Sequence, residues 1–186
     1  MSPGTPRELM DARAVEGALA RMARELVERN GGAGDMLLIG VHRRGVPLSE
    51  RLADEIERTG GERPPVGSLD ITLYRDDLMA IGPRPVVGET RLPGSGIDGR
   101  VVVIVDDVLY TGRTVRAALD ELADFGRPAR ITLCVLVDRG GRELPIQPDV
   151  VGMRVDAAAD ERVEVLVPPL DDRLGVVVAP RQEAGA

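Results

Sequence analysis

Two neighbouring carboxylates and a hydroxyl-bearing turn lie in the segment VVIVDDVLYTGRT at residues 102–114. Asp106 and Asp107 follow an apolar run with the pattern of a buried strand. Acids at the end of such a strand are expected to be exposed at the edge of the sheet, where they can accept hydrogen bonds from a vicinal pair of hydroxyls. The pair is therefore a candidate site for the 2′ and 3′ hydroxyls of a ribose.

The residues Thr-Gly-Arg-Thr at 111–114 have the makeup of a phosphate-binding turn. They enter a helical pattern, so backbone N–H groups at a helix N-terminus would face a bound anion. Gly112 permits close approach of the backbone, and Thr111 and Thr114 add hydroxyls. Taken alone, the acid pair is explained equally well as solvated charges at the end of a strand, and the turn as an ordinary helix cap. Together, a diol site and a phosphate site a sugar's length apart indicate ribose 5-phosphate.

Composition narrows the chemistry further. The 186 residues include 24 basic and 31 acidic side chains, a net charge of −7, which argues against indiscriminate binding to nucleic acid or anionic membranes. Every basic residue is Arg, which excludes a lysine Schiff base and a Walker-type P-loop. Cys134, the single cysteine, lies in an apolar run and is interpreted as a buried hydrophobe. With no leader and no membrane-spanning run, we expect a cytoplasmic protein without a membrane partner.

Apolar periodicity predicts an α/β domain that would position these residues. Helices are expected at 11–30, 47–58 and 114–124, and strands at 36–41, 69–77, 100–105 and 131–137. Their alternation implies right-handed crossovers and a parallel sheet. Short strands at 150–155, 163–167 and 174–178 would follow. The length fits a single domain over 1–186, with its core at about 9–155 and loose tails at both ends.

The segment at 102–114 resembles the signature that type I phosphoribosyltransferases use to bind phosphoribosyl diphosphate (PRPP). Its neighbours SLDITLYRDDL, TGRTVRAALD, GRPARI and VLVDRG resemble the PyrR family of bacterial pyrimidine-operon regulators, which bind pyr mRNA and also have uracil phosphoribosyltransferase activity. The similarity runs from about residue 9 to residue 155. It implies the type I phosphoribosyltransferase fold, a central, mainly parallel sheet flanked by helices, with a small hood or flap of short strands.

The resemblance implies roles for individual residues. Asp106 and Asp107 would hold the ribose hydroxyls as catalytic residues. The rest of the PRPP and UMP site would be Val108, Leu109, Tyr110, Thr111, Gly112, Arg113 and Thr114. The diphosphate loop would be His42, Arg43, Arg44 and Gly45, and the family usually has Thr in place of Arg43. Mg²⁺ would enter with PRPP rather than bind the protein directly.

Three further assignments follow from the resemblance. Arg44 would be catalytic, by offsetting charge on the departing diphosphate. The loop at 74–91, with Arg75, Arg84 and Arg91, would close over PRPP as a lid and exclude water. Val137, Asp138 and Arg139 would contact the base. A role for His42 as general base stays open.

RNA binding in the family depends on the first helix and on the region after VDRG. The candidate RNA contacts in this chain are Arg21, Arg24, Arg29, Arg142 and Arg154. The family typically reads GHRELPIRAD and VGKNVPTS where this chain reads GGRELPIQPD and VGMRVDAA. Gly141, Gln147 and Met153 thus replace a His, an Arg and a Lys, which removes positive charge where an RNA backbone would need it.

Three functions remain open from the sequence. The first is a uracil phosphoribosyltransferase, with uracil, PRPP and UMP as ligands, that also regulates pyrimidine genes through pyr leader mRNA. The second is an RNA-binding regulator whose transferase site serves mainly as a UMP or PRPP sensor. The third is a phosphoribosyltransferase for another base, such as a purine or orotate. In each case the resemblance implies a homo-oligomer, a dimer or larger.

Overall fold

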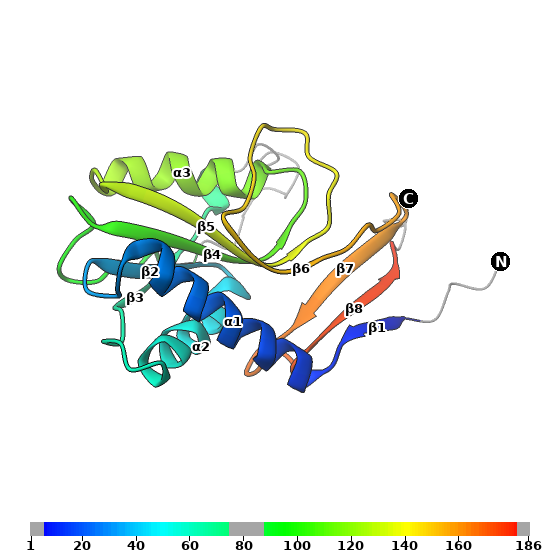
Figure 1. Ribbon diagram of the computed structural model, residues 1–186. Coiled ribbons are helices and arrows are strands. Elements are labelled where there is room, and N and C mark those ends of the chain that lie inside the picture. Colours follow the sequence, from blue (N-terminus) through cyan, green and yellow to red (C-terminus); the bar gives the residue numbers. More distant parts are fainter. Residues whose placement is uncertain (1–5, 75–87, 182–186) are drawn as a thin grey trace.

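The computed structural model describes residues 6–74 and 88–181. Its main sheet has five parallel strands in the order β3-β2-β4-β5-β6 (Figure 1). Their bounds are β2 Met36–Val41, β3 Val66–Leu69, β4 Val101–Leu109, β5 Arg130–Asp138 and β6 Val150–Arg154. The central strands are apolar on both faces, as expected for a parallel sheet covered on both sides. The predicted α/β fold with a parallel sheet is confirmed.

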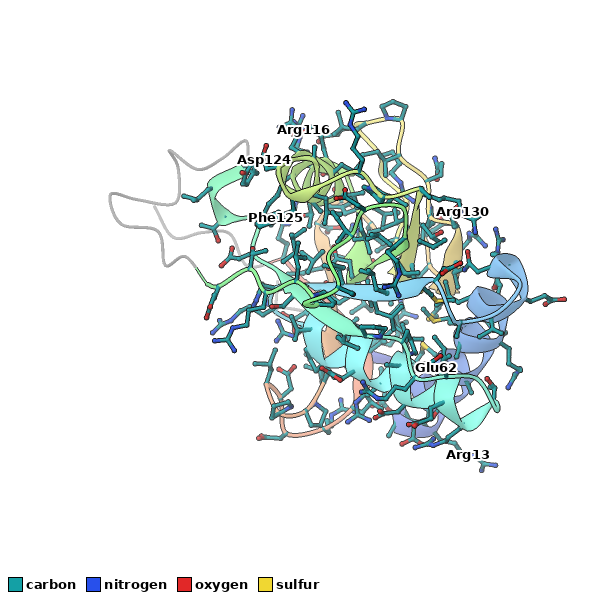
Figure 2. The ribbon with its side chains drawn as sticks, turned by 90° about the vertical axis from the view of Figure 1, so that its left-hand side faces the viewer. Arg13, Glu62, Arg116, Asp124, Phe125 and Arg130 are labelled. Atoms are coloured by element: carbon teal, nitrogen blue, oxygen red, sulfur yellow. The ribbon has the colours of Figure 1, made fainter. Side chains whose placement is uncertain are left out.

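Helices cover both faces of this sheet (Figure 1). The helices α1 (Ala12–Asn30) and α2 (Gly45–Arg58) pack on one face, and α3 (Arg113–Phe125) packs on the other. Figure 2 accordingly shows Arg13 of α1 and Arg116 of α3 at opposite sides of the molecule. A separate hydrophobic core lies on each face of the sheet. Because successive side chains of a strand point to opposite faces, Leu38 of β2 packs in the core with α1 and α2, and Leu37 packs in the core with α3.

A second, antiparallel sheet has the order β1-β8-β7. It consists of β1 (Arg7–Met10), β7 (Glu161–Leu166) and β8 (Gly175–Pro180). Val163, Val165, Val176 and Val178 join the same core as α1 and α2. The expected small hood of short strands is therefore present, and it includes an N-terminal strand that the sequence pattern did not predict, because its residues are only half-buried or exposed.

Two predicted boundaries were wrong for identifiable reasons. A strand was expected at 69–77, but the strand in this region is β3, which ends at Leu69. The Asp70 carboxylate accepts hydrogen bonds from the N–H (2.8 Å) and the hydroxyl (2.5 Å) of Thr72, which turns the chain into the 3₁₀ helix η1 (Thr72–Tyr74). The Tyr74 hydroxyl then donates to Asp124 (2.5 Å), which Figure 2 shows at the end of α3.

The second wrong boundary is the end of β4. This strand runs on to Leu109, where it still pairs with Asp138 of β5. Asp106 and Asp107 therefore lie inside the strand rather than after it, because the backbone ladder continues past the last uninterrupted apolar residue.

Candidate functional site

A cavity of about 610 Å³ opens at the carboxyl end of the main sheet. Its walls come from the loop after β2, the segment after β3, the end of β4 and the start of α3. The lining residues are His42, Arg43, Asp70, Ile71, Thr72, Gly88, Asp106, Asp107, Val108 and Thr114. Ligands of open α/β sheets bind at this edge, so this cavity is the candidate site.

The acid pair forms the floor of this cavity. Asp106 is only 6% exposed, and its Oδ1 accepts the N–H of Asp107 at 2.9 Å. The expectation that both acids are exposed is thus wrong for Asp106. Burial, and then the charge of Asp107, raises the pKa of Asp106 well above the usual range of an aspartate. A buried acid beside a second acid provides both acceptor and donor oxygens for a pair of hydroxyls.

The predicted phosphate turn leads directly into α3. Gly112 is the N-cap residue, with a φ of 92°, and it has no side chain that could cap the helix. The N–H groups of the first turn therefore receive no cap from this residue, and they lie at the positive end of the helix. The Thr111 hydroxyl accepts the Arg113 N–H at 3.3 Å. Thr114 reaches the cavity wall from the same turn.

The turn at 42–45 also contributes to this cavity. Gly45 lies so close to β4 that a Cβ there would be 2.4 Å from the Val105 carbonyl oxygen. This contact holds the loop beside the acid pair. The peptide bond between His42 and Arg43 is cis, and both residues line the cavity. Arg44 instead directs its guanidinium toward Asp171, which accepts from Nε at 3.1 Å and from Nη2 at 2.9 Å.

The residues predicted to contact the base, Val137, Asp138 and Arg139, are not among those that line this cavity. Val137 is fully buried in the core beneath α1 and α2. Asp138 accepts from Arg142 at 2.7 Å. Arg139 is buried, donates to the carbonyl oxygens of Ala158 and Glu161, both at 3.0 Å, and stacks 4.0 Å from the Tyr110 ring. Backbone groups here are engaged as well: the Arg139 N–H donates to the Leu109 carbonyl oxygen at 3.1 Å, and the Asp138 carbonyl oxygen accepts the Val155 N–H at 3.0 Å.

The candidate RNA contacts divide into engaged and exposed side chains. Arg21 donates to the carbonyl oxygens of Val151 (3.1 Å) and Gly152 (2.5 Å). Arg142 is nearly buried and donates to the carbonyl oxygens of Tyr110 and Ile146. Arg29 pairs with Glu25 on the same helix. Arg24 and Arg154 are exposed.

The predicted lid lies largely outside the described residues, since Arg75 and Arg84 fall within 75–87. Arg91 is described: its backbone pairs with Ser68 and its guanidinium with Glu89 at 2.5 Å.

Sequence reasoning missed two acids near the site. Asp70 lines the cavity; burial opposes ionisation, but hydrogen bonds from Thr72 and from the Gly88 N–H outweigh it and lower the pKa of Asp70. Its place directly after a buried strand was an available signal. Asp171 has no local signal, because its partner Arg44 is 127 residues away in the sequence.

Comparison with known proteins agrees with this geometry. The family model described as "Phosphoribosyl transferase domain" matches residues 7–173. A relative from Herpetosiphon aurantiacus, named "Bifunctional protein PyrR", is 54% identical and aligns over 96% of this chain and 99% of its own. A relative of the same name from Thermus thermophilus is 56% identical over 88% of this chain and 90% of its own.

Solved structures support the fold alone. A hypoxanthine phosphoribosyltransferase from Trypanosoma cruzi has a TM-score of 0.73 at 20% identity, covering 96% of this chain and 97% of that one. A hypoxanthine-guanine phosphoribosyltransferase from Bacillus anthracis has a TM-score of 0.70 at 15% identity, covering 97% and 99%. No helix among the described residues is long and apolar enough to cross a membrane. The chain belongs to the phosphoribosyltransferases and, within them, to the PyrR family.

Proposed function

We propose that this protein transfers ribose 5-phosphate from PRPP to uracil, giving UMP and diphosphate. The observation that carries the proposal is the cavity lined both by Asp106, Asp107 and Thr114 and by His42 and Arg43. One wall suits a ribose 5-phosphate, and the other brings cationic and N–H donors to a diphosphate. Uracil as the base is supported by the similarity to PyrR proteins over nearly the whole chain.

In this proposal each wall binds one part of PRPP. The carboxyl groups of Asp106 and Asp107 bind the ribose hydroxyls. The turn at 111–114 binds the 5′-phosphate, with Val108, Leu109 and Tyr110 bridging between them. The loop at 42–45 binds the diphosphate. Residues 137–139, at the end of β5, meet the base.

The reaction exchanges one bond at the ribose C1′. The bond to the diphosphate oxygen breaks as the bond to uracil N1 forms, and the N1 proton leaves to solvent or to a nearby base. Positive charge develops on the ribose and negative charge on diphosphate, so fixed carboxylates near the sugar and cations near the leaving group both lower the barrier. His42, the one histidine of the sequence, lines the cavity, and its role as that base stays open.

Mg²⁺ fits the chemistry of this cavity. Asp70, Asp106 and Asp107 all line it, and carboxylate oxygens are ligands that Mg²⁺ accepts. Among residues 6–74 and 88–181, no group of three or more His, Cys, Asp or Glu is arranged to hold a metal ion. We therefore propose that Mg²⁺ binds through PRPP oxygens beside the acid pair, where it would offset the charge of the diphosphate.

The test is turnover with PRPP, Mg²⁺ and a panel of bases that includes uracil, hypoxanthine, guanine and orotate. Release of diphosphate is followed for each base. We expect uracil to support turnover and the other bases to support little. Turnover with a purine or orotate but not with uracil would contradict the assignment of the base, and no turnover with any base would contradict the transferase.

A second function, binding of pyr leader RNA, is favoured by the word "bifunctional" in the names of the relatives. Arg24 and Arg154 are two of the exposed candidates for contact with the RNA backbone. A gel shift with the pyr leader of the source organism, at two salt concentrations and with or without UMP, tests it. We expect UMP to strengthen binding and Arg24→Gln with Arg154→Gln to weaken it. Binding that ignores UMP would contradict a regulatory role.

We also propose that the chain forms a single domain and acts in the cytoplasm as a homo-oligomer, a dimer or larger. Light scattering of the purified protein gives the mass of the assembly. A monomer at micromolar concentration would contradict this expectation.

A further inference from the structure

We propose that Asp171 is a positioning residue for the transferase reaction, and that it acts by orienting Arg44 toward the diphosphate of PRPP. This inference rests on the function proposed above. Asp171 lies in the connection between β7 and β8 of the small sheet, whereas Arg44 lies in the loop after β2 of the main sheet. The pair therefore ties the small sheet to the loop whose preceding residues, His42 and Arg43, line the cavity.

The contact has the two-point geometry that fixes a guanidinium in space. Nε of Arg44 donates to one carboxylate oxygen of Asp171 at 3.1 Å, and Nη2 donates to the other at 2.9 Å. Parallel hydrogen bonds of this kind define the plane and direction of the guanidinium, which a single contact does not. Arg44 is itself the N-cap residue of α2, so its side chain is oriented by Asp171 rather than by the helix.

Asp171 is held in place independently of Arg44. Its Oδ2 accepts the N–H of Val167 at 2.9 Å, and its own N–H donates to the Val167 carbonyl oxygen at 3.1 Å. Val167 and the preceding Val165 are buried in the core beneath α1 and α2. The carboxylate thus has a fixed position on the small sheet, and Arg44 is the long, flexible member of the pair.

The pairing leaves part of Arg44 for a ligand. Both hydrogen bonds lie on the Nε and Nη2 edge, and the Nη1 group makes no hydrogen bond to a described residue. The hydrogen bond to Asp171 raises the pKa of Arg44, and the charge of Asp107 adds to this effect. The guanidinium therefore lies within electrostatic reach of the acid pair, with one edge held and the other available.

Loss of the Asp171 carboxylate has a definite consequence in this arrangement. Arg44 would keep its charge but lose its fixed direction, and Asp107 is the other acid whose charge acts on it. Arg44 would then either move freely or turn toward the acid proposed to hold the ribose. Either outcome weakens binding of diphosphate, while ligands without a diphosphate keep their contacts.

The experiment compares the full-length wild type with Asp171→Asn, Asp171→Glu and Asp172→Asn. The Asp172 variant is a matched control, because this neighbouring acid is exposed in the same connection. Isothermal titration gives the Kd for diphosphate with Mg²⁺ and, separately, for UMP. Steady-state kinetics give KM for PRPP, KM for uracil and kcat. Thermal unfolding checks that each variant is folded.

For Asp171→Asn we expect the Kd for diphosphate and the KM for PRPP to rise roughly tenfold, the size of one charge-assisted hydrogen bond at a partly exposed site. The Kd for UMP and the KM for uracil should stay near wild type. Asp171→Glu should recover part of the loss, and Asp172→Asn should match wild type.

Two results would overturn the inference. One is diphosphate binding that is unchanged or tighter in Asp171→Asn, since tighter binding would mean that Asp171 competes with the ligand for Arg44. The other is equal weakening of diphosphate and UMP, which would indicate general damage to the site. Failure of the proposed function would look different, because the wild type itself would form no UMP while the diphosphate titration would still decide the role of Asp171.

Discussion

This protein has 24 arginines and no lysine, and several of the guanidinium groups bind backbone carbonyls. Arg139 and Arg142 both do so at the end of β5, and Arg21 does so at β6. The planar fork of arginine can satisfy several carbonyls at once, which an ammonium group does less well. A charged residue in a family motif can thus serve the fold rather than the ligand.

At the residue scale, the sequence predicts the role of a side chain when its partners lie in the same short segment. Asp106, Asp107 and Thr114 could be assigned to one cavity because they share a short segment. The contacts of Arg139 and Arg142 could not be predicted, because their partners include carbonyl oxygens from other segments of the chain. The role of Asp171 could not be predicted either, because it depends on a hydrogen bond to Arg44, which is 127 residues away in the sequence.

Asp106 gives a stability prediction with a definite sign. Burial raises its pKa in the folded state, so folding favours the protonated form. The associated stability is present below the usual aspartate pKa of about 4 and is lost as the pH rises through the higher pKa of the folded protein. Asp106→Asn, which stays neutral, should therefore be more stable than wild type at pH 8, by roughly 1–3 kcal/mol.

Urea unfolding at pH 4 and pH 8 measures this effect. The difference between Asp106→Asn and wild type should shrink at the lower pH, and the exposed control Asp120→Asn should show no such change. A variant that is less stable than wild type at pH 8 would show that the buried carboxylate is better compensated than its surroundings suggest.

At the scale of elements, the order of strands and helices was predictable and the irregular ends were not. The strand β2 was predicted to the residue, because its apolar run has clear limits. The end of β3 was wrong because the side chain of Asp70 redirects the chain, a local contact that apolar periodicity does not register. The small sheet was predicted only in part, because β1 gains its order from pairing with β8.

Gly45 tests how strictly the loop after β2 is placed. A Cβ at this position would lie 2.4 Å from the Val105 carbonyl oxygen. Gly45→Ala should push the loop away from β4, destabilise the protein by about 1–3 kcal/mol and weaken binding of diphosphate. Urea unfolding and diphosphate titration measure the two effects.

Gly17→Ala is the matched control, because a Cβ at this position in α1 meets nothing within 4 Å. It should stabilise the protein by roughly 0.5–1 kcal/mol, since alanine favours a helix more than glycine does. Unchanged diphosphate affinity in Gly45→Ala would mean that the loop does not need its close contact with β4.

At the scale of the whole molecule, side-chain contacts join the main sheet to the small sheet. Arg139 makes one such link, from the end of β5 to the carbonyl oxygens of Ala158 and Glu161. Tyr110, from the loop between β4 and α3, stacks on the same guanidinium. Shifts between the sheets would therefore reach the walls of the site.

Arg139→Lys tests this link without removing the charge. Lysine cannot reproduce the fork or the stacking, so we expect a loss of about 1–3 kcal/mol in the free energy of unfolding. Arg162→Lys, at an exposed position in β7, should change it by less than about 0.5 kcal/mol. Equal stability of the two variants would show that the link contributes little.

The most direct test of the proposed function is formation of UMP from uracil and PRPP by the wild type and by Asp107→Asn, measured side by side with Asp120→Asn as control. We expect the wild type and the control to form UMP and diphosphate in equal amounts. Asp107→Asn should be slower by roughly 10- to 100-fold in kcat/KM, the effect of losing a charged acceptor for a ribose hydroxyl. UMP formation by Asp107→Asn at the wild-type rate would contradict the placement of PRPP in this cavity, and the absence of UMP with the wild type would contradict the transferase itself.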